Sequence, residues 1–489
     1  MFQTLKNAWK TQELKTKLLF TLLIVILYRL GASIPVPFVD SAQMAGVINS
    51  NFNYALQLIA GDAFGQATLF ALSVSPYITS SIIIQLLTVA IPALERMAKD
   101  GEEGKKKIAM ITRIVTMALA LITAFGYTTL LVSNQVVKYM QAYTFNSTKG
   151  WVLTGTTTVV DMKFFGVTGA DLFKFIVIVA CYCAGAALVM WLAEKINEHG
   201  IGNGISIILF ANIIARLPST FVNLYNMIRT ASGVANIIIS IVWAILIAAF
   251  LLGLVWLIVW FTDSERRIPV QYAKRVVGRK MMGGQSSNLP LKLNMAGVMP
   301  VIFANSIVSI PGTLATIWPG TSAKPSWISN VANYYFNYTK PLYVLLSIIL
   351  LFAFAYFYIL ISFNPVEVAN NIRNNGGAVP GIRPGRATSD YIRKILNRIT
   401  LIGAIFLCIV SEVPKILVSI FETIYSFSVI GKPGAVVEAI VSFYQRGASS
   451  FMTVAFAGTS VLIVVGVILE TVRELEAQLT MRNYKGFLD

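Results

Sequence analysis

Few side chains in this 489-residue sequence have the type and spacing that catalysis or metal binding requires. The one histidine is His199, and the three cysteines, Cys181, Cys183 and Cys408, all lie inside apolar runs without a C-x-x-C spacing. One imidazole without a Cys or His cluster cannot build a transition-metal site. The apolar runs also lack paired aspartates or a Ser–His pair. We therefore predict no catalytic residue, no metal and no cofactor, and we expect the cysteines to be small buried hydrophobic side chains.

Nucleotide chemistry is equally unsupported by the glycine pattern. The turn from Gly200 to Gly204 has the wrong spacing for a dinucleotide site, and the chain contains no G-x-x-x-x-G-K-[ST] phosphate loop. Any energy that the protein uses must therefore come from a partner or from the membrane potential.

The composition predicts a membrane protein. Hydrophobic residues make up 56% of the chain and charged residues 12%, and the mean hydropathy is +0.71. Several apolar runs approach the roughly 20 residues that cross about 30 Å of hydrocarbon. We mark ten spans, of which the fifth is short, near residues 18–33, 76–92, 108–132, 172–193, 205–216, 237–261, 294–316, 341–363, 399–422 and 451–470.

Positive charges support this layout. With the N-terminus in the cytoplasm, 26 of the 39 Lys and Arg residues fall in inside segments and 8 in outside loops. Both termini are therefore predicted to be cytoplasmic. No signal-peptide cleavage site follows the basic start of the chain, so we expect the first span to be retained.

The ten spans divide into two sets of five, and a second half built like the first would lie inverted in the bilayer. The predicted organisation is a cytoplasmic N-terminal segment, an N-terminal half, a C-terminal half and a cytoplasmic tail, at residues 1–17, 18–216, 217–470 and 471–489. Two long cytoplasmic loops, 262–293 and 364–398, belong to the C-terminal half.

One stretch departs from the pattern of simple spans. After Gly61 and Gly65, the run from Gln66 to Ser73 is too short to cross the membrane, and Pro76 then opens a longer apolar helix. The stretch is typical of a re-entrant half-helix beside a funnel on the outer face. A surface helix at the membrane interface fits the pattern equally well.

Six ordered segments resemble the signatures of the SecY/Sec61-alpha family. The first is SPYITSSIIIQLL, from Ser75 to Leu87, and the second is WLAEKINEHGIGNGIS, from Trp191 to Ser206. The others are Arg266–Arg275, Gln285–Asn305, Val379–Gly385 and Gly458–Val465. The chain departs from the family at Ser75, where Met is usual, and in the 61–65 stretch, where paired glycines are usual. Both departures lie in or directly after the stretch that is too short to cross the membrane, and they concern how that stretch packs.

The resemblance implies an all-α membrane protein whose two inverted five-helix halves surround a central pore for unfolded polypeptides. Such a pore needs a narrow constriction that is apolar, deformable and uncharged. By resemblance, the ring of side chains at this constriction comprises Ile78, Ile82, Leu209, Ile302 and Ile463. Isoleucine in a membrane helix otherwise usually faces lipid or a packed core.

The resemblance also implies a plug and a lateral gate. The half-helix near residues 61–73 would close the outer funnel at rest, with plug residues Phe64, Gly65, Gln66, Ala67, Thr68 and Leu69. Hydrophobic segments would leave sideways between the second and third helices and the seventh and eighth. Gln85 and Asn203 are amides at membrane depth, which we expect to hydrogen-bond within the protein near this gate. Ordinary helix-to-helix bonding is the alternative for both amides, and for Gln85 it fits at least as well.

Similarity to the family further implies that the two cytoplasmic loops dock the ribosome and the motor ATPase SecA. Arg383 is the residue that we expect to couple the motor, followed by Arg266 and Arg267. The full set of docking candidates is Arg266, Arg267, Lys274, Arg275, Arg383 and Arg386. The remaining implied partners are the small membrane subunits SecE and SecG, signal sequences, nascent polypeptides and membrane lipid.

An ion-coupled secondary transporter of a small solute is the alternative, since it too could have ten spans, inverted halves and a broken helix. Transporters need ionisable groups near the midplane. Only Glu412 and Lys415 lie deep in a predicted span, where side chains three residues apart on one helix can neutralise each other. A misplaced boundary of the ninth span would explain these two residues equally well.

Overall fold

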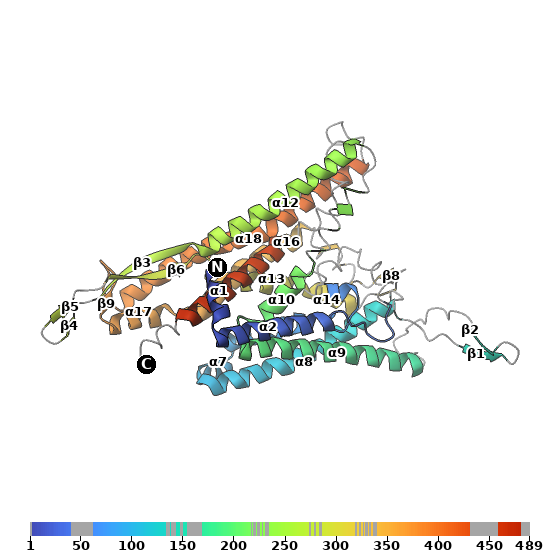
Figure 1. Ribbon diagram of the computed structural model, residues 1–489, viewed down its shortest axis with the longest axis horizontal. Helices are drawn as coiled ribbons and strands as arrows, with labels where there is room; N and C mark the ends of the chain where they lie inside the picture. The colour runs from blue at the N-terminus through green and yellow to red at the C-terminus, as the bar shows by residue number, and fades with distance from the viewer. Residues whose placement is uncertain are drawn as a thin grey trace. The chain divides into compact units, whose positions relative to one another are not determined.

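A computed structural model describes residues 2–40, 62–133, 169–216, 234–272, 286–317, 340–430 and 458–480, with short pieces inside 137–153, 218–229, 275–282 and 320–335 (Figure 1). The described residues are mostly helical, as predicted. They form two compact units. The first unit comprises Met1–Ser219, Ser306–Tyr343 and Val467–Asp489, and the second comprises Thr220–Asn305 and Val344–Gly466.

Long apolar helices dominate the first unit. Helices α8 and α9 pack together, and α2 packs on α9 (Figure 1). An ion pair between Arg113 Nε and Glu194 Oε1, 2.7 Å apart, also joins α8 to α9. The helices are α1 (Phe2–Lys10), α2 (Gln12–Gly31), α5 (Asp62–Gly65), α6 (Ser75–Ala90), α7 (Pro92–Lys99), α8 (Gly101–Ser133), α9 (Gly169–His199), α10 (Gly204–Ile214) and α14 (Ile310–Ile317). Two short hairpins are β1 (Tyr143–Asn146) with β2 (Gly150–Leu153) and β7 (Gly320–Thr321) with β8 (Lys324–Pro325).

Proline ends α6 sharply. Pro92 disfavours helical backbone at the residue before it, and Ile91 is extended, with φ −107° and ψ 113°. Helix α7 then continues at 101° to α6. The second predicted span thus ends close to its expected boundary.

The second unit combines apolar helices with a small sheet. Phe261 of α12 stacks on Phe406 of α18, with ring centroids 3.8 Å apart. Its helices are α12 (Val234–Asp263), α13 (Met299–Val308), α16 (Pro341–Ser362), α17 (Pro365–Asn374) and α18 (Arg386–Ile430). A further helix covers residues 458–480 and crosses into the first unit at residue 467. The strands are β3 (Glu265–Tyr272), β4 (Arg275–Val277), β5 (Lys280–Met282), β6 (Ser286–Lys292) and β9 (Gly377–Ala378).

The two predicted cytoplasmic loops fold together, which the sequence did not indicate. Strand β3 pairs antiparallel with β6 on one side and with β9 on the other. Alternate residues Ile268 and Val270 of β3 are buried. They share one hydrophobic core with α17 and the start of α18. We call this assembly of β3, β6, β9, α17 and residues 386–399 of α18 the basic module.

Five described helices are long and apolar enough to cross a membrane, and six if the bent pair α6 and α7 is one span. Large apolar side chains are exposed along them, such as Leu252, Trp256 and Trp260 of α12, as expected where the solvent is lipid. The number of ten stays a prediction.

The sequence was wrong about the extent of the half-helix. Only Asp62–Gly65 is helical, and residues 66–74 form successive turns. Ala67 and Ser73 have φ values of 50°, a left-handed conformation that no regular α-helix of L-residues can contain. The stretch is therefore a folded loop, and Gly61, its expected first residue, lies outside the described residues.

Candidate functional site

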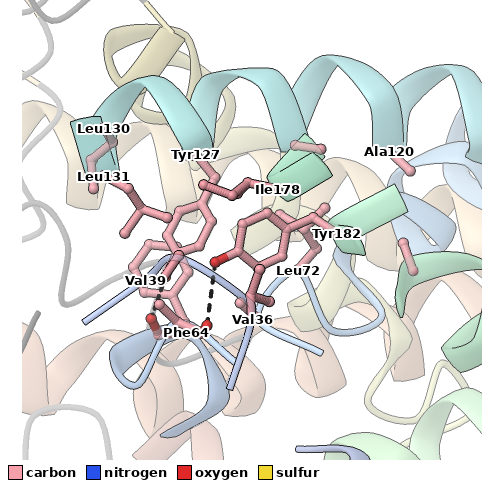
Figure 2. Close-up of a cluster of buried hydrophobic side chains, with 14 of the residues drawn as sticks. Val36, Val39, Phe64, Leu72, Ala120, Tyr127, Leu130, Leu131, Ile178 and Tyr182 are labelled. Carbon is pink, nitrogen blue, oxygen red and sulfur yellow. Dashed lines mark hydrogen bonds between the residues drawn. The ribbon is translucent and has the colours of Figure 1, made fainter. Parts of the chain in front are cut away.

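The best-defined candidate site is the folded loop of residues 62–74, which we call the plug segment. Except for Gln66 and the half-buried Leu69, its side chains from Ala63 to Val74 are buried. Phe64, Ala67, Ala71 and Leu72 belong to a hydrophobic cluster with residues of α8 and α9 (Figure 2). A connecting segment of turns thus packs as tightly as a protein core.

Two buried tyrosines hold the backbone of the plug segment. Tyr127 of α8 donates a hydrogen bond from its hydroxyl to the carbonyl oxygen of Phe64, at 2.5 Å. Tyr182 of α9 donates to the carbonyl oxygen of Ala67, at 3.3 Å. The two rings meet edge to face, with centroids 5.1 Å apart, and both phenols point at the plug segment (Figure 2).

These bonds have an energetic consequence. A buried donor or acceptor that loses its partner costs about 1–3 kcal/mol. If the plug segment left this position, the Tyr127 and Tyr182 hydroxyls and the carbonyls of Phe64 and Ala67 would all lose the partners seen here. The two tyrosines therefore favour the packed position of the segment.

Helix α9 approaches the plug segment through a glycine. A Cβ atom added to Gly185 would lie 2.0 Å from the carbonyl oxygen of Leu69. The amide of Leu69 in turn donates to the carbonyl oxygen of Ile34, at 2.9 Å. The backbone of the plug segment therefore lies directly against α9 at a point where no larger residue fits.

A closed hydrogen-bonded triangle fixes the end of the plug segment. Tyr28 of α2 donates to Oδ1 of Asn212 of α10 at 2.8 Å, and Asn212 Nδ2 donates to Ser73 Oγ at 2.9 Å. The hydroxyls of Tyr28 and Ser73 are 3.3 Å apart. All three residues are buried, so this network joins α2, α10 and the plug segment directly before α6 begins.

All five side chains predicted for the constriction are buried. Ile78 and Ile82 of α6 and Leu209 of α10 belong to the first unit. Ile302 of α13 and Ile463 of the 458–480 helix belong to the second. Burial agrees with an inward position but also with ordinary core packing, and the ring stays a prediction.

The two predicted gate amides bond locally. Asn203 caps α10, since its Oδ1 accepts from the backbone N–H of Ile205 at 3.0 Å. Gln85 Nε2 donates to Ser81 Oγ one turn earlier on α6, at 3.3 Å, and its side chain is exposed. Both of these bonds join residues close in sequence rather than two spans, and the gate stays a prediction.

The docking candidates that the structure describes lie in or beside the basic module. Arg266 and Arg267 are exposed on β3, and Arg267 Nε is 2.7 Å from Glu265 Oε1. Arg383 is exposed in the turn before α18, where its carbonyl oxygen accepts from Thr388 Oγ1 at 2.9 Å. Arg386 is exposed at the start of α18. Arg275 lies on β4, and Lys274 is outside the described residues.

Tyr28, Tyr127 and Tyr182 were not among the site residues predicted from the sequence. The polar residues predicted at membrane depth were amides and ionisable groups. A phenol in an apolar span usually finds a hydrogen-bond partner when buried, so these residues were available as a signal. Among the described residues no group of three or more His, Cys, Asp or Glu could hold a metal ion.

Comparison with known proteins supplies a family. A family model described as SecY matches residues 68–472. The protein translocase subunit SecY of Streptomyces galbus is 40% identical over 496 residues, with 100% of both chains covered.

Two solved structures share the fold. One is described as "The structure of a protein conducting channel", with a TM-score of 0.57 and 16% identity over 95% of this chain and 92% of the other. The second reports that the plug domain of the SecY protein stabilises the closed state of the translocation channel; its TM-score is 0.55, with 16% identity and the same coverage.

Proposed function

Since this chain belongs to the SecY family, we propose that it forms the channel through which unfolded secretory polypeptides cross the membrane. Hydrophobic segments would leave this channel sideways into lipid. The observation that carries the proposal is the plug segment, a turn-rich stretch beside α6 that is held by hydroxyls of two membrane helices.

In this function the plug segment is the closure of the resting channel. It carries Phe64, Gly65, Gln66, Ala67, Thr68 and Leu69. Its contacts among the described residues are hydrophobic packing and a few hydrogen bonds. Such contacts suit a segment that must leave when a polypeptide enters and return afterwards.

The constriction of the channel would consist of Ile78, Ile82, Leu209, Ile302 and Ile463. Branched aliphatic side chains can part around a passing chain and close again without offering a charge to ions. Buried Ser80 lies between the two isoleucines of α6 and donates to the carbonyl oxygen of Thr112 of α8, at 2.8 Å. That bond fixes the rotation of α6 against α8 and supports a defined direction for Ile78 and Ile82.

The chain is a multi-pass membrane protein by its family and its apolar helices. We further place it in the cytoplasmic membrane, with both termini in the cytoplasm, on the distribution of Lys and Arg. Gln85 and Asn203 would lie near the lateral gate, and SecE and SecG would be the small membrane subunits beside it.

The basic module would be the docking surface for SecA and the ribosome, which supply the energy that this chain cannot. Arg266, Arg267 and Arg386 are exposed on it, and Arg383 is exposed in the turn that leads into α18. Because its strands and helices share one core, the module can transmit force from a partner to α18 better than two separate flexible loops could. Arg383 would couple the motor, and Lys274 and Arg275 would add charge.

The transporter alternative loses its main support in the second unit. Coupled transport requires an ionisable group that is free to bind a proton, an ion or a solute. Lys415 Nζ is 2.9 Å from Glu412 Oε1, so the two deep charges neutralise each other.

A photo-crosslinking residue at Ile82 tests the channel directly. A secretory precursor would be arrested with SecA and ATP in membranes that contain the protein, and adducts would be identified by mass shift. We expect an adduct at Ile82 and none at Val89, which is exposed on the same helix. No adduct at Ile82 in an assembly with active partners would remove the pore assignment and restore the transporter hypothesis.

A further inference from the structure

An ion pair lies deep inside the second unit, where charges are costly. Glu412 and Lys415 of α18 are 1% and 3% exposed. Removing two charges from water costs several kcal/mol per ion, and their attraction often does no more than offset this cost. Stability alone therefore does not explain why the chain keeps the pair.

Hydrogen bonds extend from this pair to two other helices. Glu412 Oε1 accepts from Ser347 Oγ of α16 at 3.2 Å and from Ser411 Oγ at 3.0 Å, in addition to Lys415 Nζ. The hydroxyl of Ser411 is 3.3 Å from that of Thr459, on the 458–480 helix. Glu412 Oε2 is buried without a hydrogen-bond partner in the described part of the chain. We call Ser347, Ser411, Glu412, Lys415 and Thr459 the polar chain.

The backbone is irregular at the same level. Pro414 has no N–H, so the carbonyl of Val410 loses its partner in α18. A Cβ atom on Gly458 would lie 2.3 Å from that carbonyl oxygen and 3.1 Å from Pro414 Cγ. The backbone of the 458–480 helix at Gly458 therefore lies directly against α18 near Pro414, and Thr459 is the next residue.

Apolar helix surfaces by themselves specify register weakly, because side chains of similar size can exchange places when one helix slides along another. Directional hydrogen bonds in a low-dielectric interior hold one register only, and fixing register is the best attested use of buried polar groups. Thr459 and Ile463 are four residues apart, on the same face of their helix. The register of the helix at Thr459 thus sets the position of Ile463 along the helix axis relative to α18.

We propose that the Glu412–Lys415 pair, acting through Ser411 and Thr459, fixes the register of the 458–480 helix against α18 and thereby positions Ile463 in the channel constriction. The positioning of Ile463 rests on the proposed channel function, whereas the register claim does not. All members of the polar chain are positioning residues, since none of them touches the polypeptide.

The test replaces the pair with apolar residues of similar size, E412L with K415M. Such a replacement often preserves or raises stability, so we expect an unchanged or higher thermal unfolding midpoint of the purified protein. Register is measured separately. The distance between two spin labels is compared with and without E412L/K415M, in a chain whose three native cysteines are alanine. The labels are carried by cysteines that replace the exposed residues Ile402 of α18 and Ile468 of the 458–480 helix, so the polar chain stays intact.

We expect the double replacement to raise the population of a displaced label distance on the order of tenfold, which corresponds to about 1.4 kcal/mol in the register equilibrium. Vesicles with the E412L/K415M protein should leak small ions at rest. The matched control is T400V, which removes another buried hydroxyl of α18 that donates to the carbonyl oxygen of Leu396 in its own helix. It should change neither quantity.

The outcomes separate the two ideas. An unchanged label distance in E412L/K415M would overturn the register proposal, whatever the ion leak. A displaced label distance without any leak would support the register proposal and contradict the place of Ile463 in the constriction. A displaced label distance together with a leak would support both.

Discussion

At the scale of single residues, the plug segment depends on hydroxyl groups. Tyr127 and Tyr182 reach carbonyl oxygens rather than side chains. Almost any sequence offers such carbonyls, so the plug residues can vary while the tyrosines still hold the backbone.

Tyr127→Phe tests the strongest of these bonds. The change keeps the ring, which packs on Phe64 with centroids 4.7 Å apart, and removes only the hydroxyl. We expect the closed state to lose about 1–2 kcal/mol, near the usual cost of leaving one buried carbonyl without a partner. Small-ion conductance of vesicles at rest should therefore rise between about fivefold and thirtyfold.

The control for this change is Tyr334→Phe, at a largely exposed tyrosine of the first unit. It should leave the resting conductance unchanged. Equal conductance of the Tyr127→Phe and native proteins would show that the hydroxyl does not hold the plug segment closed.

At the scale of elements, the close approach of α9 to the plug segment determines how α9 responds to substitution. Glycine inside a helix is about 1 kcal/mol less favourable than alanine. The chain nevertheless has Gly185 there, because a methyl group would collide with the Leu69 carbonyl.

Gly185→Ala is therefore expected to destabilise the protein, although alanine favours a helix more than glycine does. We expect a net loss of about 1–3 kcal/mol, typical of overpacking, seen as a lower unfolding midpoint and faster hydrogen exchange in the plug segment. Gly253→Ala is the matched control, since no atom lies within 4 Å of a Cβ there. That change in α12 should be neutral or stabilising; a stabilising Gly185→Ala would contradict the close contact.

At the scale of the whole molecule, the formal net charge of +17 is concentrated on the side predicted to be cytoplasmic. The basic module gathers part of that charge on a folded surface. Positive charge that neutralises phosphates releases counterions, so binding to anionic RNA weakens steeply with salt.

Arg266→Ala should reduce the salt dependence of ribosome binding. If Arg266 contacts one RNA phosphate, the slope of log affinity against log salt should become shallower by about 1. Affinity would be measured by co-sedimentation of ribosomes with vesicles across a salt series. Lys340→Gln, at an exposed residue predicted to be outside, should leave the slope unchanged, and an unchanged slope for Arg266→Ala would exclude that arginine from the RNA contact.

The sequence by itself determined the class of protein and its mostly helical fold. Apolar run length, charge asymmetry and ordered motifs are properties of neighbouring residues, and they identified a membrane protein of the SecY family before any contact was known. The burial of Ile78, Ile82, Leu209, Ile302 and Ile463 agrees with their predicted role but does not test it. The pairing of Glu412 with Lys415 followed from their spacing on one helix and is confirmed.

Only the tertiary structure decided how distant segments meet. The Tyr127–Phe64 bond joins residues 63 positions apart, and the polar chain joins α18 to helices on both sides of it in the sequence. Residues 66–74 of the plug segment form turns rather than a half-helix, because the left-handed residues Ala67 and Ser73 are held by hydrogen bonds to other helices. The two cytoplasmic loops share one core for the same reason: hydrogen bonds and packing between segments depend on three-dimensional proximity, which local composition and periodicity do not encode.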